Sequence, residues 1–285
     1  MINAIMGMLA ETPLHPGSGQ TTGVIDLPVA RERTTDYPVI PGSGLKGALR
    51  DFAEQLLLDT GNADRLFGQP ENAGAIAVTD ARLLLLPVRS LNTHFVWVTC
   101  PYLIERYRRD CELAGLATIL PKIPQVDLKE GQAAVAGTVH DLLYLEELSF
   151  EVVVADLSSL AAAFAPLIKH ESVRSRLQKY VVMVNDDEFR YFARHCLTVN
   201  ARNELKKETK TSNNLWYEET VPADTLFYAL LITRPTCHDS WPIATVAELF
   251  SKRPYLQVGG NETVGQGWCA VSLLTGEVKD NGSSN

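Results

Sequence analysis

The sequence has few cysteines, and they follow no pairing pattern. The five cysteines are an odd number without a C-x-x-C pair, at positions 100, 111, 196, 237 and 269. A disulfide framework is therefore not expected, and this cysteine usage favours the cytosol. The pairs His195-Cys196 and Cys237-His238 are poor zinc chelators, because adjacent side chains on a helix or strand point in different directions.

Long apolar runs and several catalytic motifs are also missing. No stretch approaches the about 18 apolar residues of a membrane span. Residues 1–4 lack the basic stretch of a signal peptide, so we expect a cytoplasmic protein without a membrane partner. The sequence contains no G-x-S-x-G elbow, H-E-x-x-H or P-loop motif. Its 285 residues, 46% of them hydrophobic, are enough for a sizeable core.

Positive charge is in deficit over the whole chain but not in every segment. There are 26 Lys and Arg against 34 Asp and Glu, a net charge of −8, which argues against a generic nucleic-acid binder. The net charge is −8 over residues 1–164, +4 over 165–210 and −4 over 211–285. The middle stretch can contact a polyanion, because phosphate contacts act at short range. A solvated helix face is the alternative interpretation.

Hydrophobic patterning predicts an α+β fold with an antiparallel sheet. We expect strands at 2–9, 74–79, 82–86, 94–99, 142–154, 180–185, 225–233 and 267–274, and helices at 45–56, 102–114, 157–168, 187–196 and 244–252. These elements do not alternate regularly, which disfavours a parallel α/β fold. The polar segment 198–223 is expected to protrude as a loop or hairpin, and the tail 277–285 to fray.

A glycine-rich turn opens the expected helix 45–56. Residues 42–47 read GSGLKG and formally match G-x-G-x-x-G, but two preceding prolines are unsuited to the central strand of a dinucleotide site. The free N–H groups at such a helix start can instead bind a phosphate. Ser43, Gly44, Lys46 and Arg50 are therefore candidate phosphate-binding residues, with a simple helix cap as the alternative.

Two other segments carry candidate chemistry. Asp26 lies between apolar neighbours just after a flexible loop that contains His15. A carboxylate there can bind a divalent ion or orient a hydroxyl for phosphodiester cleavage, although a turn-forming Asp is the simpler interpretation. The segment VGGNETVGQGW at 258–268 has four glycines, which permit close approach of the backbone to a ligand.

Three segments together resemble the RAMP superfamily. They are HPGSG at 15–19 followed by Asp26, IPGSGLKGALR at 40–50, and VGGNETVGQGW at 258–268. With LWYEE at 215–219, they resemble the repeated backbone subunit of type III-B (Cmr) CRISPR effector complexes, and the Csm-type equivalent is the alternative. The resemblance implies one domain over 1–285: an RRM-like (ferredoxin-like) palm with an antiparallel sheet, finger insertions and a thumb hairpin at 198–223.

The resemblance also implies a function. Several copies are expected to stack as a filament along a CRISPR guide RNA, together with other subunits of the complex. Each copy is expected to cut matched single-stranded target RNA at regular intervals, using a divalent metal, Mg²⁺ or Mn²⁺. Asp26 matches the catalytic and metal-ligating position, and His15, Tyr217 and Glu218 are further catalytic candidates. The implied RNA-binding residues are Ser43, Gly44, Lys46, Arg50, Asn261, Thr263, Gly265 and Gly267.

Two rival functions remain open at this point. One is a structural RNA-binding filament subunit without nuclease activity. The other is a related endonuclease that matures CRISPR RNA as a monomer, for which a catalytic His and two RRM-like halves are typical. The loop that carries Asp26 and the polar segment 198–223 favour the backbone subunit over the processing enzyme.

Overall fold

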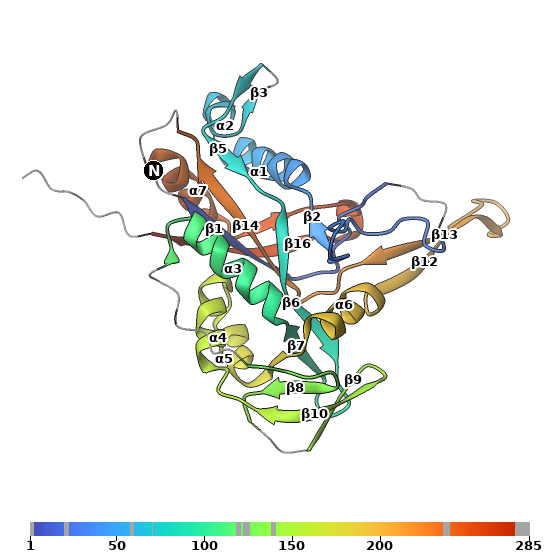
Figure 1. Cartoon of the computed structure of the whole chain (residues 1–285). Coiled ribbons are helices and arrows are strands. Elements are labelled where there is room, and N and C mark those ends of the chain that lie inside the picture. The colour runs from blue at the N-terminus through green and yellow to red at the C-terminus, as the bar shows by residue number, and fades with distance from the viewer. Residues whose placement is uncertain are drawn as a thin grey trace, which may run out of the picture.

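A large twisted sheet runs through the molecule, with helices on both faces and one exposed ribbon (Figure 1). The computed structural model describes residues 3–19, 23–57, 60–69, 71–117, 121, 126–137, 141–235 and 240–276. The tail 277–285, expected to fray, lies outside the described residues.

The strands range from two to nine residues in length. Their bounds are β1 (Ala4–Ala10), β2 (Val39–Ile40), β3 (Gly68–Gln69), β4 (Asn72–Ala73), β5 (Ile76–Val78), β6 (Ala81–Arg89), β7 (Phe95–Thr99), β8 (Gln132–Val135), β9 (Leu142–Leu145), β10 (Leu148–Val154), β11 (Val181–Met183), β12 (Thr198–Leu205), β13 (Ser212–Thr220), β14 (Leu226–Thr233), β15 (Tyr255–Gln257) and β16 (Trp268–Thr275).

The helices lie between these strands without a regular alternation. Their bounds are α1 (Gly42–Leu56), α2 (Thr60–Phe67), α3 (Pro101–Leu113), α4 (Ser158–Phe164), α5 (Glu171–Tyr180), α6 (Asp186–His195) and α7 (Trp241–Lys252), with 3₁₀ turns η2 (Ala165–Leu167) and η3 (Glu262–Val264). No helix among these described residues is long and apolar enough to cross a membrane.

The main sheet is mostly antiparallel, which confirms the expected fold class. Its strand order is β15-β16-β1-β14-β6-β7-β11-β8-β10-β9, with β2 paired to β6 and β5 paired to β14. Two neighbouring pairs are parallel, β11 with β7 and β10 with β8. The remaining pairs along this path are antiparallel.

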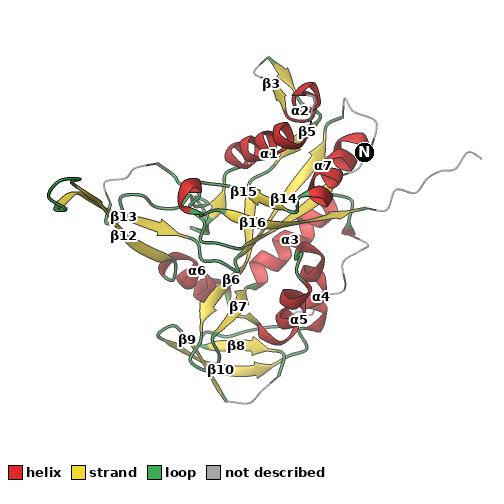
Figure 2. Ribbon diagram, turned by 180° about the vertical axis from the view of Figure 1, so that it is seen from behind, coloured by secondary structure: helices red, strands yellow, loops and turns green. Residues whose placement is uncertain are grey.

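Strand β1 shows why the sheet is covered on both faces. All seven of its residues are buried, as expected for a strand whose sequence is a continuous apolar run. Met6 and Met8 join one core cluster, whereas Ile5 and Leu9 join the other, because successive side chains of a strand point to opposite faces. The second cluster includes residues of α3, α4 and α5, which gather over that face (Figure 2).

Helix α1 packs on the first face through residues at helical spacing. Leu45, Leu49 and Phe52 are buried, and the Phe52 ring stacks on Phe250 of α7 with ring centroids 4.9 Å apart. The glycine turn that was expected to precede this helix instead forms its first residues, from Gly42. The short strand β2 that precedes it pairs with β6, so α1 follows a two-residue strand rather than a long central one.

The structure differs from the expected elements in several places, and α2 is a helix that the sequence did not predict. The single strand expected over 142–154 is a hairpin, β9 and β10, because the chain turns at Glu146, where φ is +49°. Helix α5 was not expected from the sequence, since Leu177 is its one buried residue and its apolar periodicity is weak. The expected helix 157–168 ends as α4 at Phe164 and continues as the 3₁₀ turn η2.

The polar segment 198–223 contains a two-stranded ribbon, β12 with β13, that projects from the sheet (Figure 1). Its register runs from Thr198 opposite Thr220 to Leu205 opposite Ser212. Most of its residues are exposed, whereas Glu218, Glu219 and Thr220 at its base are buried. The ribbon therefore has a solvated tip and a buried base.

Candidate functional site

Three segments that are distant in sequence meet at the base of the β12–β13 ribbon. The early loop, residues 11–19 and 23–31, pairs with β13 and the residue after it through bridges from Leu27 to Glu218 and from Leu14 to Val221. The glycine loop, residues 258–267, joins the early loop through two backbone hydrogen bonds, from Gly260 N to His15 O at 2.9 Å and from Gly267 N to Pro13 O at 2.9 Å.

Two glycines shape the glycine loop where it meets the early loop. Gly259 has φ +80°, and a Cβ there would lie 2.5 Å from the His15 carbonyl oxygen. Gly267 has φ +85°, and its Cβ would lie 2.1 Å from the Val258 carbonyl oxygen. Both the left-handed backbone and the lack of space require glycine. Gly259 therefore serves the approach between the two loops, whereas Gly267 lets the glycine loop close on its own Val258.

His15 is held in a defined orientation beside β13. The residue is 8% exposed, and its Nδ1 lies 2.7 Å from the Glu219 carbonyl oxygen. A carbonyl oxygen can only accept a hydrogen bond, so Nδ1 carries the proton and Nε2 of the neutral ring is an acceptor. Nε2 faces Gly17, where a Cβ would lie 3.0 Å away. The geometry thus leaves a basic nitrogen beside a residue with no side chain.

Glu218 is a buried carboxylate between the early loop and the glycine loop. Its residue is 3% exposed. Its Oε1 accepts a hydrogen bond from Asn261 Nδ2 and lies 4.0 Å from His15 Nδ1. Arg202 Nε of β12 lies 3.6 Å from Oε2. The carboxylate therefore lies where it can stabilise positive charge on the His15 ring.

Asp26, in the early loop, is partly exposed and contacts the backbone of β13. Its Oδ2 accepts a hydrogen bond of 2.8 Å from Tyr217 N, and Leu27 N donates to Tyr217 O at 3.1 Å. The Tyr217 side chain itself is 45% exposed. Residues 217 and 219, which hold Asp26 and His15, are about 7 Å apart along an extended strand. The structure therefore brings all four catalytic candidates, His15, Asp26, Tyr217 and Glu218, to the base of one ribbon.

Glu219 fixes the far end of the early loop. Its carboxylate accepts hydrogen bonds from Val29 N at 3.1 Å and from Arg31 Nη2 at 2.7 Å. Arg31 also donates to the Asp36 and Ala193 carbonyl oxygens at 2.7 and 2.8 Å. This residue was not among the candidates expected from the sequence. Glu219 is the last residue of the LWYEE motif, but the sequence alone does not show whether its side chain is buried or exposed.

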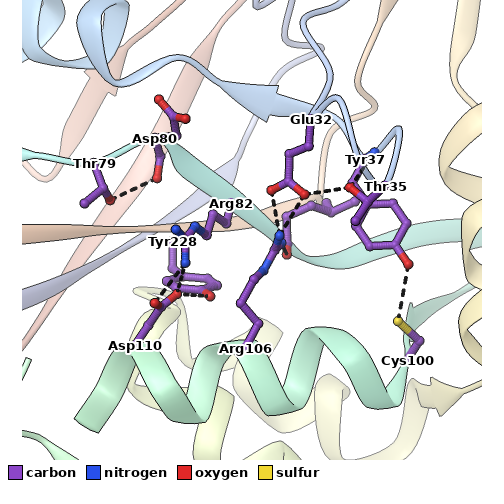
Figure 3. Close-up of polar contacts among 11 residues, drawn as sticks. Glu32, Thr35, Tyr37, Thr79, Asp80, Arg82, Cys100, Arg106, Asp110 and Tyr228 are labelled. Atoms are coloured by element: carbon purple, nitrogen blue, oxygen red, sulfur yellow. Dashed lines mark hydrogen bonds and ion pairs between the residues drawn. The ribbon is translucent and has the colours of Figure 1, made fainter. Parts of the chain in front are cut away.

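Helix α3 anchors the chain that follows the early loop (Figure 3). Arg106 Nη1 donates to both carboxylate oxygens of Glu32 at 2.7 Å, and Thr35 donates to Glu32 at 2.6 Å. Further along α3, the Asp110 carboxylate accepts hydrogen bonds from Arg82 and from the Tyr228 hydroxyl. Glu32 is therefore fixed to α3, and Asp110 ties α3 to β6 and β14 of the sheet.

The four cysteines in the described part of the chain do not take part in this site. Cys100, Cys111, Cys196 and Cys269 are free thiols. Burial raises the pKa of Cys111, Cys196 and Cys269 to about 12. A thiol with such a pKa is protonated near neutral pH and is a poor nucleophile. Cys237 lies outside the described residues.

The phosphate-binding candidates on α1 divide into two groups. Ser43, Gly44 and Lys46 are exposed in the first turn. Arg50 instead forms ion pairs with Glu54 and Asp64 and donates to the Gly68 carbonyl oxygen, so it ties α1 to α2 and β3. The helix start is also partly occupied, because Asp80 Oδ1 accepts a hydrogen bond from Gly42 N at 2.6 Å.

The candidates on the glycine loop divide in the same way. Thr263 in the turn η3 and Gly265 just after it are exposed. Gly267 is buried against Val258. Asn261 is partly buried, and its amide points to Glu218 and Gln266. Thr263 and Gly265 are thus placed for contact with a ligand, whereas Gly267 and Asn261 hold protein groups together.

The sequence and the fold match one protein family. The RAMP superfamily model matches residues 8–270. The CRISPR system Cmr endoribonuclease Cmr4 of Pyrococcus furiosus is 37% identical over 297 residues, covering 99% of this chain and 98% of that protein. The CMR subunit Cmr4 of Saccharolobus solfataricus is 26% identical and covers 90% and 92%. A crystal structure of oligomeric Cmr4 from Pyrococcus furiosus superimposes with a TM-score of 0.78 at 32% identity, covering 97% and 99%.

The chain therefore belongs to the RAMP superfamily, and within it to the Cmr4 proteins of CRISPR Cmr systems. This confirms the resemblance drawn from the three glycine-containing segments and the LWYEE motif. It also favours the Cmr branch over the Csm-type alternative.

Proposed function

We propose that this chain is the backbone subunit of a cytoplasmic type III-B CRISPR complex and cleaves guide-matched target RNA at the base of its β12–β13 ribbon. The observation that supports this most is the placement of His15, Asp26, Tyr217 and Glu218 around one strand. The Pyrococcus furiosus relative, 37% identical, bears the name endoribonuclease. The partners are guide RNA, single-stranded target RNA, further copies of the chain and the other subunits of the complex.

The site suits attack by a ribose 2′-hydroxyl on the neighbouring phosphate. His15 Nε2 takes the hydroxyl proton, a bond forms between O2′ and phosphorus, and the bond from phosphorus to O5′ breaks. The exposed Tyr217 hydroxyl is available to protonate the leaving O5′. The Glu218 carboxylate, 4.0 Å from His15 Nδ1, stabilises the imidazolium that forms. Asp26 orients the 2′-hydroxyl or the scissile phosphate from the exposed side of β13.

A divalent metal fits this site only in combination with RNA. Among the described residues no group of three His, Cys, Asp or Glu side chains could hold a metal ion. Mg²⁺ commonly binds one or two carboxylates together with phosphate oxygens and water. Asp26 is the residue that would hold Mg²⁺ or Mn²⁺ beside the phosphate, where the ion would neutralise developing negative charge.

The test is Asp26→Ala in the assembled complex with matched target RNA. We expect the single-turnover cleavage rate to fall by about a hundredfold or more, with target binding unchanged. Asp187→Ala, exposed on α6, is the matched control and should cleave as wild type. A cyclic 2′,3′-phosphate at the cut would support the 2′-hydroxyl route, and loss of cleavage in EDTA would support the metal.

Three outcomes would count against the proposal. Cleavage by Asp26→Ala at the wild-type rate would remove Asp26 from the mechanism. A complex that binds guide and target but cleaves nothing would favour the structural filament subunit. A discrete monomer that matures guide RNA, resolved by size exclusion, would favour the processing endonuclease.

A further inference from the structure

We infer that Asn261 is a positioning residue that orients the Glu218 carboxylate toward His15, rather than a residue that contacts RNA. The inference rests on the proposed function, because it assigns a role within the same site. The loop that carries Asn261 belongs to a different part of the chain from β13 and the early loop, so its side chain links the third segment of the site to the other two.

The backbone of the glycine loop holds Asn261 in a fixed conformation. Asn261 has φ +63° and ψ +29°, a left-handed conformation that Asn adopts more readily than most residues. Its carbonyl oxygen accepts hydrogen bonds from Val264 N at 3.1 Å and Gln266 N at 3.2 Å. The loop is therefore closed on Asn261, and the direction of its side chain is set before any ligand binds.

Both hydrogen atoms of the Asn261 amide point into the protein. Nδ2 donates to Glu218 Oε1 and, at 2.9 Å, to Gln266 Oε1. A side-chain NH₂ group has two hydrogens, so these two acceptors use its full donor capacity. An RNA phosphate needs a donor, and Thr263 on the exposed side of the same loop can supply one. The loop thus separates an inward residue from an outward one.

Glu218 needs this donor because its carboxylate is buried. A buried carboxylate without hydrogen-bond partners is costly, and its orientation follows the donors that are present. Arg202 lies on the Oε2 side at 3.6 Å, and Asn261 lies on the Oε1 side. Without Asn261 the carboxylate would turn toward Arg202, and Oε1 would leave its position 4.0 Å from His15 Nδ1.

The experiment uses the assembled complex with guide and matched target RNA. Asn261→Gly keeps the left-handed backbone and removes the amide, whereas Asn261→Asp keeps the shape and places a second carboxylate against Glu218. We expect both variants to cleave at a rate about ten- to a hundredfold lower under saturating single-turnover conditions, the range found when a residue that orients a functional group is lost. Target affinity should stay within about twofold of wild type. The loss of one bidentate contact to RNA would change the affinity by more than this. Glu262→Gln, exposed in the same loop, is the control and should match wild type.

A double-mutant cycle with Glu218→Gln separates this role from a structural one. If Asn261 acts through Glu218, Asn261→Gly should add less than about a twofold loss in the Glu218→Gln background, because residues that act as a unit are not additive. Independent losses that multiply would overturn the inference. So would weaker target binding with an unchanged saturated rate, which would assign Asn261 to RNA. If Asp26→Ala abolishes cleavage but Asn261→Gly does not, the positioning role of Asn261 is refuted and the proposed function stands. If the wild-type complex does not cleave, the proposed function is refuted.

Discussion

Two consecutive glutamates on β13 have different tasks because a strand directs them to opposite sides. Glu218 faces His15 and Asn261, and Glu219 faces Val29 and Arg31. Both are 3% exposed, so burial alone does not distinguish the catalytic candidate from the residue that fixes the loop. Their hydrogen-bond and charge partners distinguish them. Glu219 binds a backbone N–H and an arginine, whereas Glu218 lies beside the imidazole ring of His15. A shift of β13 by one residue would exchange these roles.

At the residue scale, Gly17 controls access to the base. Gly17→Ala would place a Cβ 3.0 Å from His15 Nε2, on the nitrogen that accepts the proton in the proposed mechanism. We expect the cleavage rate to fall at least about tenfold, since general base catalysis contributes about 10²–10⁴-fold and depends on this contact. The free energy of unfolding should change by less than about 1 kcal/mol, because Gly17 is exposed.

The matched control for Gly17 is Gly137→Ala. A Cβ at the exposed Gly137 meets no atom within 4 Å. Cleavage kinetics and urea unfolding of both variants, measured side by side, check the prediction. A Gly17→Ala variant that cleaves normally would show that the substrate proton does not reach Nε2.

At the scale of elements, the sequence predicts local structure better than it predicts partners. The helix 45–56 follows from Leu45, Leu49 and Phe52, and the glycine loop follows from its own glycines. The contact between His15 and Glu219 joins residues 204 positions apart, and no local pattern indicates it. Arg50 shows the same limit. Its sequence neighbours suggest that it binds a phosphate, but its guanidinium forms an ion pair with Asp64 on the next helix. The sequence did not predict that helix.

Strand β1 and the turn η2 pack so tightly that Gly7 tolerates no side chain. A Cβ at Gly7 would lie 2.2 Å from the Leu167 carbonyl oxygen, a backbone atom that cannot move without shifting the turn. Gly7→Ala should therefore destabilise the fold by about 1–3 kcal/mol, as overpacking does. Gly47→Ala, at an exposed helical position with no atom within 4 Å, should instead stabilise by about 0.5–1 kcal/mol. Urea unfolding of the two variants checks the opposite signs, and a neutral Gly7→Ala would contradict this packing.

At the scale of the molecule, the basic stretch 165–210 is divided among α5, α6, which carries Arg190 and Arg194, and the β12–β13 ribbon. Helix α5 packs in the core cluster on the face of the sheet that also holds α3 and α4, and it carries Arg176 and Lys179 there. Lys206, Lys207 and Lys210 lie exposed near the tip of the β12–β13 ribbon. The ribbon therefore receives only part of the positive charge that the sequence assigns to this stretch.

This division predicts which lysines contribute to RNA binding. Replacing Lys206, Lys207 and Lys210 together by Gln should weaken RNA binding and reduce the slope of log K against log salt by up to about 2, since each neutralised phosphate of a single strand contributes about 0.7. The matched control removes three charges elsewhere, through Lys169→Gln, Arg176→Gln and Lys179→Gln, and should leave the slope unchanged. Both triple variants have the same net charge, so a difference between them measures the position of the charge. Filter binding between about 50 and 200 mM salt provides the slope. Equal slopes in the two variants would show that the ribbon tip does not contact the RNA backbone. The protein would then bind RNA through the site at the base of the ribbon.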